Sequence, residues 1–556
     1  MQELGLKGFK PVNYIFGILF SLSIVMGFQC EFYEHLIPGS WKTWFFLIVI
    51  AAVATVFSKM FWDMIAERKH VERPDKDIPA GRVWFFSSLA VWVMNFIVFL
   101  GVYPGFFVYD AFEELNETVT RSFNDQHPLF HVLSMGAIIQ GMHKLTGDYN
   151  ISIAAFILIQ MTVNAVILGF VIRELYKEGI GRIITILLTI YFGVFPVVVM
   201  NNLCSSKDSL FTGFMVLLTV FLRRYFAEKE DTSGQKKNLV KIFICSLLVM
   251  LYRSNGIYAM AVYLVFLIIY FAATQNKTEK EDNPARIKLL AVIASAMILY
   301  LIINAAFLGL TKAQRVGHRE ILTVPIMQLA RVYAYDNESM SSEDKALLER
   351  YIPRENLMAY TPKCSDLIKI GFDENAFKAD KGGFLGLWIR TGLKHPVAYL
   401  DALCMTGYGM WYSNATIDGY EGREVFTFTY GRSSYFGYET EPPGVRTSFI
   451  PAIDRFYKDL SIKGGDKRIM IVNLLFSPGF MLWAYVFMLG YFVYAGCCER
   501  SFAYLPALIV IMTCFIGPMS LVRYAFSLWI LVPLSFADVM LFDKEKTSEE
   551  TDVIEI

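Results

Sequence analysis

The chain has 556 residues, of which 55% are apolar or aromatic and only 18% are charged, and its mean hydropathy is +0.43. A soluble globular protein carries about 25% charged residues, so this composition excludes a soluble enzyme, a disordered chain and a coiled coil. The formal net charge is zero, so a nucleic-acid partner is not expected. The eight cysteines include no CxxC pair and predict neither a disulfide scaffold nor a zinc site.

Membrane-spanning segments account for most of the length. A spanning helix needs about 20 predominantly apolar residues. About twelve segments meet this requirement; they are residues 12–31, 44–65, 83–103, 150–172, 183–200, 209–226, 239–254, 257–274, 288–309, 470–495, 504–520 and 523–542. Only the turn-forming sequence Arg253-Ser254-Asn255-Gly256 separates the seventh from the eighth, which predicts a tight hairpin. We therefore expect an all-α polytopic membrane protein.

The basic residues predict the orientation of these spans, because cytoplasmic loops carry an excess of Lys and Arg. With the N-terminus in the cytoplasm, the cytoplasmic segments hold 23 Lys and Arg residues and the short outer segments hold 6. Both termini are then cytoplasmic. The segment 310–469 then lies outside, and the rule does not apply to it because it is a long loop.

This arrangement divides the chain into five parts. They are an N-terminal pair of spans (1–82), a transmembrane module with an outer loop at 104–149 (83–309), an extracytoplasmic domain (310–469), the last spans (470–542) and a cytoplasmic tail (543–556).

Two outer segments are expected to be mainly helical. In the first, residues 127–146 are rather apolar but include three histidines, which suits a helix lying on the membrane surface. In the extracytoplasmic domain, helical patterns cover 321–335, begin again near Ser341, and cover 382–405 with a break before Pro396. A stretch rich in Tyr and Gly follows at 407–438 and could stack on sugar rings or simply pack a small domain.

Four acidic residues follow the third span at helical spacing: Asp110, Glu113, Glu114 and Glu117. Asp110 lies closest to the membrane, where partial desolvation is expected to raise its pKa and make it a better base. The alternative is a solvated acidic helix face, which is the commoner meaning of such a run.

Other candidate residues lie at the outer ends of later spans. Asp125 and His127 precede Pro128, which suits the first turn of a helix. His127 and His131 have a spacing that can bind metal, although an interfacial pair without metal is the simpler interpretation. Lys207 and Asp208 lie in a short outer loop. Arg253 and Arg523 each lie between apolar runs, where an Arg snorkels, pairs with a carboxylate or binds an anionic headgroup.

The order of these motifs resembles the GT-C glycosyltransferases, which include protein O-mannosyltransferases and lipid A aminoarabinose transferases. The matching features are Asp110 in YDAFEE, His127-Pro128, Lys207-Asp208, Arg253-Ser254-Asn255-Gly256 and Arg523-Tyr524. Ala111 follows Asp110 where the family motif has Glu. The resemblance covers about half of the chain, with residues 83–309 as the family's module. The chain is also similar to bacterial membrane proteins that carry the same signatures.

The resemblance implies an inverting glycosyltransferase in the bacterial plasma membrane, with its active site on the outer face. It would move a sugar from a polyprenyl-phosphate donor to an acceptor of the cell envelope. Asp110 would be the catalytic base, with Asp125 as a second catalytic candidate. Lys207, Arg253 and Arg523 would bind the donor phosphate. Glu113, His127 and Asp208 are further candidates, and no cofactor is expected with certainty, although a divalent cation is possible. The competing interpretations are a transporter or flippase of lipid-linked sugars and a surface-polysaccharide polymerase or ligase.

Overall fold

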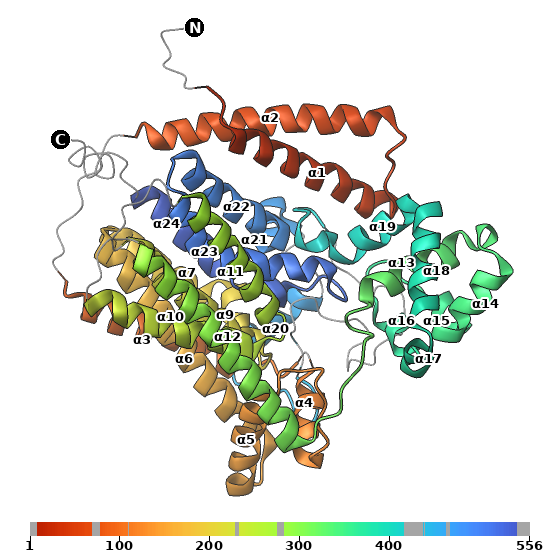
Figure 1. The fold of residues 1–556 in the computed structure, drawn as a ribbon. Helices are drawn as coiled ribbons and strands as arrows, with labels where there is room; N and C mark the ends of the chain where they lie inside the picture. The colour runs from red at the N-terminus through yellow and green to blue at the C-terminus, as the bar shows by residue number, and fades with distance from the viewer. Residues whose placement is uncertain are drawn as a thin grey trace.

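The protein is built of helices (Figure 1). The computed structural model describes residues 8–68, 78–108, 110–227, 233–274, 283–415, 438, 440–462 and 468–541. Within these ranges the extended backbone pairs only in three isolated bridges. The expected cytoplasmic tail, 543–556, and most of the stretch at 407–438 lie outside the described residues.

Nine of the described helices are long and apolar enough to cross a membrane, or eleven if two bent pairs each form one span. The nine are α1 (Pro11–Tyr33), α2 (Trp41–Ala66), α3 (Ala80–Gly101), α6 (Tyr149–Glu178), α9 (Asp208–Ala227), α11 (Gly256–Ala273), α12 (Asn283–Thr311), α23 (Cys498–Thr513, continued by η6, Cys514–Ile516) and α24 (Leu528–Leu541) with the preceding turn η7 (Val522–Ala525). The chain is therefore an all-α polytopic membrane protein, as its composition predicts.

The bent pairs break where proline begins the second helix. α7 (Arg182–Val194) and α8 (Pro196–Leu203) meet at 56°, and α21 (Met470–Phe476) and α22 (Pro478–Tyr494) meet at 70°. A proline at the first helical position lacks the N–H that would continue the previous helix, so the chain changes direction there.

The expected span at 239–254 lies within α10 (Ser233–Tyr252), which is not among the nine. α10 begins earlier than the apolar run and includes three lysines in its first turns, Lys236, Lys237 and Lys241. The predicted hairpin is confirmed, because α10 ends at Tyr252 and α11 begins at Gly256, with Gly256 N–H donating to the carbonyl of Arg253 at 2.9 Å.

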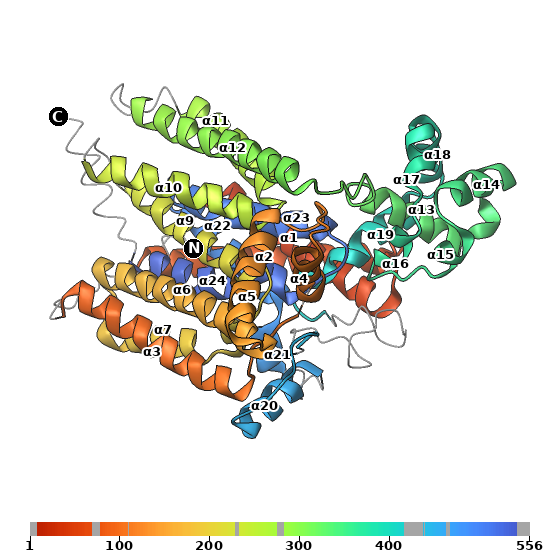
Figure 2. The ribbon, with the colours of Figure 1, turned by 90° about the horizontal axis from the view of Figure 1, so that it is seen from below.

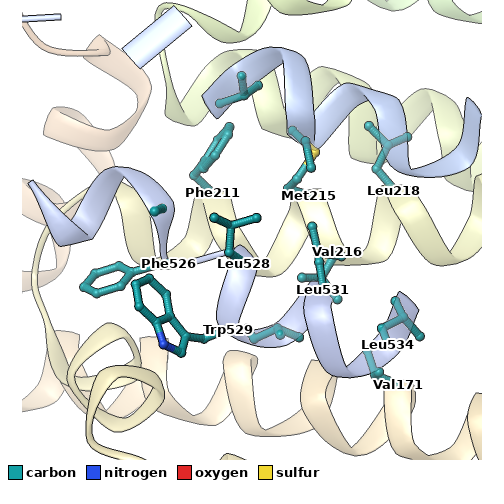
Figure 3. Close-up of a cluster of buried hydrophobic side chains, with 14 of the residues drawn as sticks. Val171, Phe211, Met215, Val216, Leu218, Phe526, Leu528, Trp529, Leu531 and Leu534 are labelled. Carbon is teal, nitrogen blue, oxygen red and sulfur yellow. The ribbon is translucent and has the colours of Figure 1, made fainter. Parts of the chain in front are cut away.

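The spans pack around a continuous apolar core. Figure 3 shows one part of it, where Phe211, Met215 and Leu218 of α9 lie in the same buried cluster as Leu528 and Leu531 of α24. α3 packs along α6, and α10 packs between α9 and α12. On α2, in contrast, apolar side chains are exposed. Trp44, Ile48 and Val53 are more than half exposed, as expected for a lipid-facing surface.

The helical part of the segment 310–469 forms a separate lobe with its own core, at one side of the bundle (Figure 2). It comprises α13 (Thr323–Tyr335), η3 (Asn337–Ser339), α14 (Ser342–Tyr351), α15 (Arg354–Met358), α16 (Asp366–Ile370), α17 (Glu374–Ala379), α18 (Lys381–Lys394), α19 (Pro396–Gly407) and η4 (Tyr408–Met410). The three helical patterns predicted in this segment are confirmed, including the break before Pro396 and the start after Ser341, whose hydroxyl accepts from Asp344 N–H at 3.1 Å. A further helix, α20 (Pro451–Ile462), packs against α3 instead.

Candidate active site

Four segments that are far apart in the sequence meet in one site: the loop 104–149, the chain before α9, the turn before α11 and the turn η7. The loop contains α4 (Ala111–Thr120) and α5 (Leu129–Thr146), so the predicted helix over 127–146 is confirmed as α5. Phe106 N–H donates to the Leu203 carbonyl at 3.0 Å, and Ser205 N–H donates to the Phe106 carbonyl at 2.9 Å. This short ladder aligns the chain after α3 with the chain before α9, and it brings Asp110 next to Lys207.

Asp110 is the residue from which α4 begins. Its backbone has φ +73°, a left-handed conformation that Asp tolerates better than most residues. Oδ2 of its carboxylate lies 3.5 Å from Lys207 Nζ, and 3.4 and 3.3 Å from Nη1 and Nη2 of Arg523. The side chain is 33% exposed. Asp110 is therefore held between two cations while part of it remains accessible.

Lys207 joins three partners around one ammonium group. Its Nζ lies 3.5 Å from Asp110, 3.4 Å from Glu114 Oε1 and 2.8 Å from His127 Nδ1. An ammonium has three N–H donors and no acceptor, so these contacts use all of them. His127 Nδ1 is therefore the acceptor in the shortest of the three contacts.

Glu114 is the buried acid of the site, and the candidate residues chosen from the sequence omitted it. Its side chain is 1% exposed, with Oε1 3.6 Å from His127 Nδ1 and Oε2 3.1 Å from Nε2 of the buried His131. The neighbouring Glu113, which was chosen, points to solvent with 67% of its side chain exposed and comes no closer than 4.0 Å to His127. Spacing alone offered no signal between the two, because residues three and four positions after Asp110 both share its face.

A second ion-paired group adjoins the first. Arg253 donates to Asp208 through Nη1, and Arg523 Nε lies 3.7 Å from Asp208 Oδ2, so Arg523 links Asp208 to Asp110. The Tyr524 ring contacts both guanidiniums, at 4.8 Å from Arg253 and 5.2 Å from Arg523. These contacts hold the planar cations in fixed positions.

The electrostatics correct one expectation. Burial raises the pKa of Asp110, but the charges of Arg523 and Lys207 outweigh it, so that its pKa lies well below the usual value rather than above it. Glu114 behaves alike: burial raises its pKa, while His131 and Lys207 lower it to about 2. Both carboxylates are therefore ionised at neutral pH, and the cations hold them so.

Asp125 does not join this cluster. It is exposed, and Oδ1 of its carboxylate accepts from Val316 N–H at 2.7 Å, while its own N–H donates to the Gln314 carbonyl at 3.0 Å. Asp125 therefore ties the outer loop to the chain that enters the helical lobe. Apart from the exposed Glu113, the other candidates all lie within the two linked groups. They are Lys207, Asp208, Arg253, Arg523 and His127.

The site also contains a group of possible metal ligands. One ligand atom each from Asp110, Glu114 and His127 lies within 4.8 Å of the others. Two carboxylates and an imidazole suit a divalent cation. However, the ammonium of Lys207 already contacts all three residues. A cation could bind there only if Lys207 moved away.

The relationship to known proteins extends over most of the chain. None of the curated proteins matches it. A family model described as a family of unknown function, DUF6020, matches residues 39–553, which include every residue of the site. The chain therefore belongs to the DUF6020 family.

Proposed function

We propose that the protein is an inverting glycosyltransferase that moves a sugar from a polyprenyl-phosphate donor to an extracytoplasmic acceptor of the cell envelope. The observation that carries this proposal is the accessible Asp110 carboxylate held between Lys207 and Arg523. A transferase of this kind needs an acceptor-activating carboxylate beside cations that stabilise a departing phosphate. Both are present within one hydrogen-bonded group.

The donor phosphate would compete with Asp110 for its cations. All three N–H donors of Lys207 are already in use, so a phosphate can gain Lys207 only by displacing one of its acceptors. Asp110 is the most exposed of the three and would be the first to leave. Once separated from Lys207 and Arg523, its carboxylate would have a higher pKa and would be a stronger base. Phosphate binding would thus prepare the base for the transfer step.

The reaction that this arrangement supports is a single displacement. Asp110 would accept the proton of the acceptor hydroxyl while that oxygen attacks the anomeric carbon from the face opposite the phosphate. The bond to the phosphate breaks, and Lys207, Arg523 and Arg253 neutralise the charge that develops on the leaving group. One base and one displacement invert the anomeric centre, in contrast to the two displacements of a retaining mechanism.

The location of the site fits a lipid-linked donor. Asp110 follows α3 closely, Asp208 begins α9, and Arg523 precedes α24, so the charged groups gather at the ends of apolar helices. A polyprenyl phosphate carries its anion at such a boundary, with its hydrocarbon in the bilayer. We place this boundary at the outer face of the bacterial plasma membrane, with both termini in the cytoplasm, because the Lys and Arg distribution favours that orientation.

The test is a comparison of cell-envelope glycans by mass spectrometry in a strain that lacks the gene. Complementation with the wild-type chain should restore a sugar that the deletion removes, and Asp110→Asn should fail to restore it at equal membrane abundance. Asp125→Asn is the matched control, because Asp125 lies outside the cluster, and it should restore the sugar. An Asp110→Asn strain with the full wild-type glycan would refute the proposal. A flippase or transporter that uses Asp110 only as an ion-pair partner would give that result.

A further inference from the structure

Two cysteines from distant parts of the chain share one buried cluster. Cys30 lies near the end of α1 and Cys404 lies in α19, and they are 0% and 8% exposed. Leu36, Met405 and Tyr408 are among the side chains that complete the cluster. Figure 1 shows the end of α1 meeting α19 at the junction between the membrane bundle and the helical lobe. All eight cysteines are free thiols in this structure.

The surfaces that carry the two thiols are held together by directional contacts. The Leu36 N–H donates to Asp401 Oδ1 at 2.7 Å, and the Tyr408 hydroxyl donates to Glu31 Oε2 at 2.7 Å. Asp401 also accepts from Arg331 at 3.3 Å. The first two contacts join residues near Cys30 to residues near Cys404. The third, from Arg331, holds the Asp401 carboxylate in place. The interface therefore sets the relative position of the thiols without help from a covalent bond.

Close packing adds to this restraint. A Cβ at Gly27 would overlap the ring of Tyr412, so α1 approaches the end of the lobe as closely as a glycine permits. Cys30 lies one helical turn beyond Gly27 on α1. The two thiols belong to the same buried cluster. Hydrogen bonding by the Cys30 thiol lowers the pKa of Cys404 and outweighs burial, which raises it.

We propose that Cys30 and Cys404 form a disulfide in the mature protein, which ties the first span to the extracytoplasmic lobe. The inference rests on the outer-face orientation used in the proposed function, because disulfides persist in oxidising compartments. None of the glycosyl-transfer chemistry enters it. The adjacent Cys497 and Cys498, at the opposite end of the bundle in this orientation, would stay reduced.

The bond forms by thiol–disulfide exchange with a disulfide-bearing oxidant outside the membrane. The Cys404 thiolate attacks one sulfur of the oxidant and releases the other as a thiolate. The Cys30 thiolate then attacks the mixed disulfide and releases the second thiolate. The two cysteines lose two protons and two electrons, and the oxidant becomes a dithiol. Exchange takes place during assembly, before the interface buries both sulfurs.

The test is thiol trapping of the full chain. Cells are dissolved in SDS with N-ethylmaleimide, which alkylates every free thiol once the chain has unfolded, and peptides are then analysed by mass spectrometry before and after reduction. The expected result is a reducible cross-link between the peptides of Cys30 and Cys404. The other cysteines should already be alkylated before reduction. Alkylation of all eight without reduction would overturn the proposal.

Variants give the matching controls. Cys30→Ser should free Cys404 for alkylation, whereas Cys245→Ser, which removes a buried thiol elsewhere, should leave the cross-link unchanged. A Cys404 that stays blocked in Cys30→Ser would also overturn the proposal, because its partner would then be another thiol. The outcome is independent of catalysis: Asp110→Asn should retain the cross-link. A wild-type chain with the cross-link but no effect on envelope glycans would refute the proposed function alone.

Discussion

Removal of the Asp110 charge is expected to separate binding from catalysis. Asp110→Asn keeps the shape of the side chain but no longer neutralises Lys207 and Arg523. If the donor phosphate displaces Asp110 from these cations, the variant should bind a polyprenyl phosphate more tightly than the wild type. It should nevertheless lose transfer, because the amide cannot accept the proton of the acceptor.

The magnitude follows from the geometry. A charge pair at 3.5 Å, the distance between Lys207 and Asp110, has an attraction of about 5 kcal/mol at an effective dielectric constant of about 20. A third of the Asp110 side chain is exposed, so solvent screening and the hydration of the displaced carboxylate reduce the net cost of displacement to about 1–2 kcal/mol. We expect a dissociation constant about 5- to 30-fold lower in Asp110→Asn. Loss of a general base should slow transfer by about 10²- to 10⁴-fold.

The assay is calorimetric titration of purified chain in lipid nanodiscs with a polyprenyl phosphate, which represents the leaving group and needs no knowledge of the sugar. Asp125→Asn serves as the control and should bind like the wild type, because Asp125 contacts only the chain near Val316. Equal or weaker binding by Asp110→Asn would refute the competition between Asp110 and phosphate.

Further predictions concern the neighbours of Asp110 and the opposite end of the bundle. Lys207→Ala should weaken polyprenyl phosphate binding by at least about 10-fold in the same titration, through loss of a charge-assisted contact, and unchanged binding would exclude Lys207 from the phosphate site. Glu114 has its pKa lowered to about 2 from 4.5, so its stabilising contribution is complete above pH 4.5 and is lost as the pH falls toward 2; thermal unfolding of Glu114→Gln should lack this dependence, and an unaltered profile would contradict it. Asp538→Ala removes the carboxylate that the buried Arg223 contacts at 2.9 Å and leaves Glu178 as its carboxylate partner, so it should lower the free energy of unfolding by about 1–3 kcal/mol. A thermal midpoint equal to that of the wild type would contradict this prediction.

Much of the fold could be predicted from the sequence, because apolar run length and proline position determine helices locally. The hairpin at Arg253–Gly256 and the break before Pro396 are examples. The N-terminal start of α10 shows the limit of prediction from hydropathy. Hydropathy identified the apolar part of the helix, but helical structure continues into the lysine-rich residues before it, where exposed lysines favour helix about as well as leucine does.

The site was predictable in part. Sidedness and motif order selected Asp110, Lys207, Arg253 and Arg523, which the structure brings into two linked groups. Spacing could not distinguish Glu113 from Glu114, because the choice depends on which side of α4 faces α5. The sign of the Asp110 pKa shift was wrong for a related reason: desolvation can be inferred from one segment, whereas the opposing cations come from segments about 100 and 400 residues away.

The central claim is that the charged cluster opens to the outer face of the membrane. The direct measurement is labelling of Glu113→Cys in intact cells with a membrane-impermeant maleimide, because Glu113 borders the cluster and is 67% exposed. Lys177→Cys, at the exposed far end of α6, is the matched control. We predict that Glu113→Cys is labelled in intact cells and that Lys177→Cys is labelled only after the membrane has been permeabilised. The reverse pattern would contradict the orientation, and with it the proposed transfer outside the cell.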